Sequence, residues 1–159
     1  MLLIFVSLFA AFLALKKKES RCFTVCILAC LYSIMHLVYR TPQLANTLLY
    51  DVLSVASLPF LMAMLIATVW VFRKPLENDK HYILPIIFCA GVFLDKVIRK
   101  IFFHIQAEQA KEIGADGYEI FQKVSRGSTI LDIIYYLFFG GMVVSVICIL
   151  NSTKRERDS

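Results

Sequence analysis

Five ionisable residues fall within or at the edge of long apolar runs, where a charge is costly and usually has a role. Asp95 and Arg99 are four residues apart, a spacing that places both on one face of a helix. Lys96 and Lys100 adjoin them, and Asp132 lies near the start of the next apolar run. At the standard helical rise, Arg99 or Lys96 reaches the same height as Asp132. We therefore predict an ion pair across two helices, with Asp95 also reaching Arg99.

The same residues allow an interpretation without a buried ion pair. If the fourth span is short, Lys96, Arg99 and Lys100 extend to the outer headgroups. Asp132 then lies at a helix N-terminus, where Thr129 three residues earlier resembles a capping box and a carboxylate favours the helix dipole. Exchanging the charges of Arg99 and Asp132 separates the two interpretations.

Other residues that commonly carry catalysis or bind metals do not form a convincing site. Cys22, Cys26 and Cys30 recur every four residues, so one helix face could present thiolates to Cu(I). No CxxC pair accompanies them, and packing as small apolar side chains accounts for them better. The sequence has no Ser/His/Asp order, no P-loop and no dinucleotide-binding glycine motif. We expect a non-enzymatic protein with no metal and no cofactor.

The composition places these residues in a lipid bilayer. Of 159 residues, 59% are apolar and 18% are charged, against roughly 45–50% and about 25% in soluble domains. The 17 basic residues stand in short clusters between apolar runs, which is typical of segments that orient a membrane protein. No basic and aromatic surface large enough for nucleic acid is expected.

Five apolar runs separated by short polar segments predict an all-α fold, a polytopic membrane helical bundle with five transmembrane helices. The expected spans cover residues 2–15, 22–39, 52–72, 82–103 and 129–150, within a single domain over 1–159. The first run is short for a hydrocarbon core of about 30 Å, so the lysines after it should extend to the headgroups. Pro59 predicts a kink in the third span, and Pro85 suits the first turn of the fourth.

The only long polar stretch is an extramembrane segment at 106–128. Gly114 to Gly117 predicts a turn. Nothing breaks the fourth helix before Gly114, so that helix should continue past the membrane. Tyr118, Phe121 and Val124 have helical spacing, which predicts a short helix resting on the membrane surface.

Basic residues predict the orientation of the chain. With the N-terminus outside, the inside segments hold ten of them, namely Lys16, Lys17, Lys18, Arg21, Arg73, Lys74, Lys80, Lys154, Arg155 and Arg157. The outside loops hold Arg40, Lys111, Lys123 and Arg126, joined by Lys96, Arg99 and Lys100 if the fourth span is short. This bias predicts an N-terminus outside and a C-terminus in the cytoplasm, and we expect the membrane to be a bacterial inner membrane.

Small residues at four-residue spacing indicate places where helices approach closely. They are Ala10 and Ala14, Ala63 and Ala67, and Gly141 and Ser145, with Gly91 and Gly140 as further flat positions. Some of them must serve packing within the bundle. A pair that faces lipid would suit a partner helix or a second copy of the chain.

The small size, short loops and lack of catalytic motifs favour a protein that acts through helix–helix contacts with another membrane protein. It would be a small subunit, an assembly factor, or an immunity or exclusion protein. In span number and length the chain resembles the immunity proteins for pore-forming colicins, a resemblance of architecture only. The alternative is a small homo-oligomeric channel or transporter lined by the charged residues of the fourth span. The expected partners are the lipid bilayer and another membrane protein or a second copy, and not nucleic acid.

Overall fold

The computed structural model describes residues 2–39, 48–76, 80–113 and 117–158. Apart from the turn at 17–19, these ranges are helical, and they contain no strand. The elements are α1 (Leu2–Lys16), α2 (Ser20–Tyr39), α3 (Leu48–Leu76), the short 3-10 helix η2 (Lys80–Tyr82), α4 (Ile83–Ile113) and α5 (Gly117–Asp158). The predicted all-helical fold is confirmed.

Four helices are long and apolar enough to cross a membrane. Their apolar stretches are Ser20–Val38, Val52–Arg73, Lys80–Gln106 and Ile130–Ser152. The fifth, α1, has 15 residues, which is about 22 Å at the helical rise and less than the roughly 30 Å of the hydrocarbon core. The chain thus has four helices of spanning length and one shorter apolar helix, where the sequence predicted five spans.

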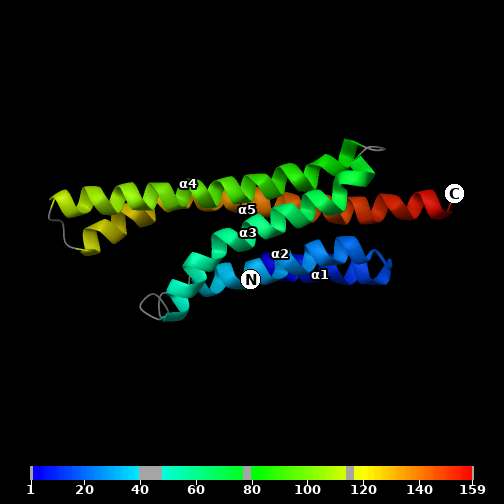
Figure 1. Ribbon diagram of the computed structural model, residues 1–159, viewed down its shortest axis with the longest axis horizontal. Coiled ribbons are helices and arrows are strands. Elements are labelled where there is room, and N and C mark those ends of the chain that lie inside the picture. Colours follow the sequence, from blue (N-terminus) through cyan, green and yellow to red (C-terminus); the bar gives the residue numbers. More distant parts are fainter. Residues whose placement is uncertain (1, 40–47, 77–79, 114–116, 159) are drawn as a thin grey trace.

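The helices run along one long axis in two pairs (Figure 1). One pair is α1 with α2, the other is the longer pair of α4 with α5, and α3 packs against both α2 and α4. Helix α1 also contacts α5, so the two pairs close into one bundle. Small side chains permit this closeness, because Ala10 and Ala14 of α1 are fully buried. Large apolar side chains such as Phe12 and Trp70 are exposed on the outside, as lipid-facing residues are.

One end of the bundle gathers the turn after α1 and the later part of α5. The Lys17 ammonium donates hydrogen bonds to the Leu150 carbonyl and to Asn151 Oδ1, the latter at 3.0 Å. Tyr82, just before α4, lines a small cavity with Arg21 and Leu150 at this end. The turn after α1, the start of α4 and the later part of α5 therefore lie at the same end of the bundle.

Pro59 and Pro85 both lie within helices. Pro59 is inside α3 and does not end it, because a helix packed among others tolerates the loss of one hydrogen bond. The kink expected at Pro59 stays a prediction, since α3 continues through this residue as one helix. Pro85 lies in the first turn of α4, and α4 continues to Ile113 as expected.

Two expectations for the polar segment are corrected. The predicted surface helix is the first part of α5, which runs unbroken from Gly117 to Asp158. No proline interrupts this stretch, and the single Gly127 costs only about 1 kcal/mol, so the helix continues. Thr129 consequently lies inside α5 and does not cap it. Most of the predicted turn, at 114–116, lies outside the described residues.

Candidate functional site: a buried charge cluster beside an intramembrane cavity

Arg99 stands at the centre of a charge cluster between α4 and α5. Its Nε donates to Asp95 Oδ2 at 2.8 Å, one helical turn earlier on α4. Its Nη1 donates to Asp132 Oδ1 of α5, also at 2.8 Å. The side chains of Arg99, Asp95 and Asp132 are 11%, 3% and 17% exposed. The predicted ion pair is present, and the interpretation of Asp132 as a helix cap is wrong.

The two lysines of the predicted cluster differ in environment. Lys96 is 8% exposed, whereas Lys100 lies on the exposed side of α4. Asp95 and Asp132 thus face Arg99 directly, with Lys96 as a second buried cation on the same helix. Buried ions are tolerated only when opposite charges and hydrogen bonds compensate for lost hydration. These ion pairs therefore hold α4 against α5.

Two atoms of the charge cluster make no hydrogen bond to a described residue. Asp95 Oδ1 and Arg99 Nη2 are buried and have no hydrogen-bond partner among the described residues. A buried polar atom without a partner carries a desolvation cost. The cluster therefore retains one acceptor and one donor for a water, an ion or a further polar group.

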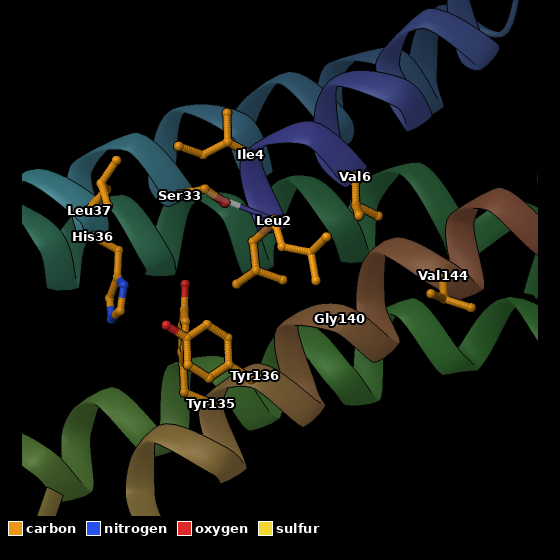
Figure 2. A pocket seen from close by; sticks show the side chains of 11 residues that line it. Leu2, Ile4, Val6, Ser33, His36, Leu37, Tyr135, Tyr136, Gly140 and Val144 are labelled. Atoms are coloured by element: carbon orange, nitrogen blue, oxygen red, sulfur yellow. The ribbon is translucent and has the colours of Figure 1, made fainter. Parts of the chain in front are cut away.

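A cavity of about 520 Å³ lies between α1, α2 and α5 (Figure 2). Its apolar wall includes Leu2, Leu3, Val6, Leu37 and Val144. Its polar wall consists of Ser33, His36, Tyr135 and Tyr136. Ligand pockets commonly have this size and this mixture of a mainly apolar lining with a few polar groups.

Aromatic stacking fixes the polar wall. The rings of His36 and Tyr135 lie 4.3 Å apart and are inclined by 16°. Tyr32 and Phe139 pack around them, with centroids 5.7 Å (Phe139) and 6.4 Å (Tyr32) from that of Tyr135. In Figure 2 the Tyr135 side chain points from α5 toward α2, beside His36. Tyr135 is only 2% exposed, and its hydroxyl has no hydrogen-bond partner among the described residues.

The cavity was not foreseen from the sequence, although two signals for it exist. Tyr135 and Tyr136 interrupt an aliphatic run about a turn and a half after Ile130, deeper than an interfacial aromatic belt requires. Tyr32 and His36 are four residues apart, so they share one face of α2. Tyr135 follows Asp132 by three residues on α5, which places the cavity next to the charge cluster.

The predicted small residues divide into inward and outward sets. Gly91 and Gly141 face inward in a reciprocal arrangement. A Cβ added at Gly91 would clash with the Phe138 ring, and one at Gly141 would lie 2.7 Å from the Phe88 ring. Ala10, Ala14 and Ser145 are also buried, and Ser145 Oγ donates to the Met142 carbonyl.

Three small residues do not serve this packing. Ala63 is exposed and Ala67 is partly exposed on α3. Gly140 lines the cavity, and a Cβ added there would meet no atom within 4 Å. These positions leave a flat strip on α3 and an opening beside α5.

The cysteine stripe of α2 packs into the interior. Cys22, Cys26 and Cys30 are all free thiols and are buried. Within the described residues, no three His, Cys, Asp or Glu side chains come together as metal ligands. Burial among apolar neighbours is sufficient to account for these residues.

Comparison with models of protein families, with curated proteins and with solved structures finds no match to this chain. Its function is therefore inferred from the geometry of the charge cluster, the cavity and the outer surface of α3.

Proposed function

We propose that this chain is a non-enzymatic integral membrane protein that acts through helix–helix contacts with another membrane protein. The observation that carries the proposal is the outward position of Ala63 and Ala67 on α3, the least buried of the four long apolar helices. Small residues one turn apart let a second helix approach closely in lipid, where association depends on packing and not on the hydrophobic effect. A small subunit, an assembly factor or an immunity or exclusion protein would use such a strip.

The charge cluster supports this proposal by its location. Arg99 is bonded to Asp95 and Asp132 inside the α4–α5 contact, so its charge is used to hold the bundle together. Side chains that line a conduit must instead remain available to a passing ion. The cluster therefore fits a stable scaffold for the α3 surface better than a transport path.

The membrane placement belongs to the same proposal. We place the chain in a bacterial inner membrane with five crossings, α1 included, its N-terminus outside and its C-terminus in the cytoplasm. The contact of Lys17 with Leu150 and Asn151 supports this, since the lysine cluster after α1 and the end of the last span share one level. Lysine stems can extend a short helix to the headgroups, which compensates for the length of α1.

Site-specific photocross-linking in native membranes tests the function. A photoreactive residue at Ala63 should give one discrete adduct with another membrane protein. The matched control is the same residue at Val69, which is exposed on the same helix but turned away from Ala63 by roughly a third of a turn. Adducts of equal yield at both positions, or adducts only to lipid, would contradict the proposal.

A second candidate function is a homo-oligomeric channel or transporter. The buried Asp95 Oδ1 and Arg99 Nη2, which lack hydrogen-bond partners among the described residues, favour it, because such atoms could receive an ion or a water chain. Ion flux through the purified protein in liposomes, lost in Asp95→Asn, would support this candidate over the first.

A further inference from the structure

We infer that the cavity between α1, α2 and α5 is a binding site for a neutral, lipid-soluble molecule that carries a carbonyl oxygen on an apolar body. The inference is independent of the proposed contact through α3, because none of the described residues that line the cavity belongs to α3. It follows from the size of the cavity, the chemistry of its walls and the Tyr135 hydroxyl.

The lining favours uncharged ligands. The described residues that form it include no Lys, Arg, Asp or Glu, so a phosphate or an ammonium group would meet no carboxylate, ammonium or guanidinium on the cavity wall itself. A charged group without such compensation is costly among apolar helices in a bilayer. A neutral molecule that has partitioned into lipid is the class that can enter.

The Tyr135 hydroxyl specifies the polar group of the ligand. It is buried, and no described residue accepts its proton or donates to it. A phenolic O–H that lacks an acceptor in an apolar setting gains most from a ligand oxygen that brings one. A carbonyl oxygen supplies this acceptor without adding a donor that would itself need a partner.

The shape of the polar wall favours a flat carbonyl-bearing ring. Tyr135 and His36 stand stacked at 4.3 Å beside the cavity, and Figure 2 shows both at its polar edge, with Leu2 opposite. Aromatic faces pack well against planar rings. The remaining wall of Leu3, Val6 and Val144 suits an aliphatic chain attached to the ring.

Gly140 is a position at which a larger side chain should fill the cavity and leave the fold unchanged. A Cβ added there meets no atom within 4 Å, and Gly140 lines the cavity, so the longer side chain of Gly140→Leu should extend into the cavity and fill it. Tyr135→Phe removes only the hydroxyl. Because that hydroxyl lacks a partner in the described part of the chain, this variant should fold as well as the wild type.

The experiment measures equilibrium binding of two radiolabelled probes to the protein in lipid nanodiscs, with empty nanodiscs subtracted. The probes are a decyl-substituted benzoquinone and decylbenzene, which share a planar six-membered ring and a decyl chain, and of which only the benzoquinone carries carbonyl oxygens. We expect saturable binding of the benzoquinone to the wild type. Tyr135→Phe should weaken it by about tenfold, as loss of one buried hydrogen bond does, and Gly140→Leu should abolish it.

Two variants outside the cavity serve as matched controls. Tyr82→Phe removes a hydroxyl at the other end of the bundle, and Val55→Phe adds volume at an exposed position of α3. Both should bind the benzoquinone as the wild type does. Equal binding of the two probes, or benzoquinone binding that neither Tyr135→Phe nor Gly140→Leu changes, would overturn the inference and leave the cavity to lipid chains or water.

Discussion

Arg99 Nη1 lies 2.8 Å from Asp132 Oδ1, and this bond joins α4 to α5 across 33 residues of sequence. The same guanidinium is held from the other side by Asp95. Two carboxylates therefore fix one arginine at the contact between the two longest helices. In lipid such a bond both holds the helices together and fixes their register, because a shift of either helix would leave a buried charge without its partner.

Removing either member of the pair should destabilise the bundle. Arg99→Ala leaves Asp95 and Asp132 buried together without their cation, and Asp132→Ala removes the link to α5. Each should lower the free energy of unfolding by about 3 kcal/mol, measured by circular dichroism in mixed detergent micelles. The exchange Arg99→Asp with Asp132→Arg should recover part of this loss. Single variants as stable as the wild type would show that the pair contributes nothing.

The reciprocal glycine and phenylalanine contacts should be sensitive to a single methyl group. Gly91→Ala places a Cβ in steric clash with the Phe138 ring, so the ring or the helix must move, at a cost of about 1–3 kcal/mol. Gly140→Ala, on the neighbouring α5, is the matched control. It meets nothing within 4 Å and should be neutral or stabilising by up to about 1 kcal/mol. Equal effects of the two variants on the unfolding midpoint would contradict this packing.

The proximity of Lys17 and Asn151 can be tested by cross-linking. In a background without the native cysteines, Lys17→Cys with Asn151→Cys should be joined by a short bifunctional thiol reagent. The matched pair, Lys17→Cys with His104→Cys, should not be joined. His104 lies 21 residues after Ile83 on α4, which is about 32 Å along the helix. Joining of the second pair but not of the first would exclude the arrangement described.

The orientation can be tested with the same cysteine positions. A membrane-impermeant maleimide added to intact cells should not label Lys17→Cys, because the proposed topology places this cysteine in the cytoplasm. The same reagent should label Lys17→Cys after the membrane is permeabilised. A tag at the N-terminus should be accessible outside and one at the C-terminus only inside. Tags found on the same face would contradict a chain of five crossings.

The cysteines should differ in reactivity by their burial. Cys148 is exposed on α5, whereas Cys22, Cys26, Cys30 and Cys89 are buried. A lipid-soluble maleimide should therefore modify one thiol quickly in the folded protein and the other four only after unfolding, as mass spectrometry would show. Rapid modification of the α2 cysteines would mean that this helix does not pack as described.

Pair spacing and helical rise were enough to predict the ion pairs of Arg99 with Asp95 and Asp132. Asp95 and Arg99 share a helix face by their spacing, and the height of Asp132 follows from the start of its apolar run. The capping alternative for Asp132 failed because the start of α5 was assigned by hydropathy, whereas polar residues before Thr129 continue the same helix. Helix continuation through a polar segment has only a weak signal when no proline marks the end.

Predicting the cavity requires the rotation of each helix, which the sequence does not show. Whether Tyr135 meets His36 depends on the rotation of α2 and α5 about their own axes, which packing sets and an all-round apolar run does not indicate. Whether a small residue faces inward or outward also depends on the rotation of its helix. Gly91 faces Phe138, Gly140 faces open space and Ala63 faces outward, although all three carry the same signal in the sequence.

We propose that this chain works as a scaffold for contact with another membrane protein and not as a conduit. The most direct measurement combines the mass of the purified protein in lipid nanodiscs with ion flux into liposomes that contain it. A scaffold of this kind should give a single copy per nanodisc and no flux above that of empty liposomes. A closed ring of copies that passes ions, with the flux lost in Asp95→Asn, would contradict it.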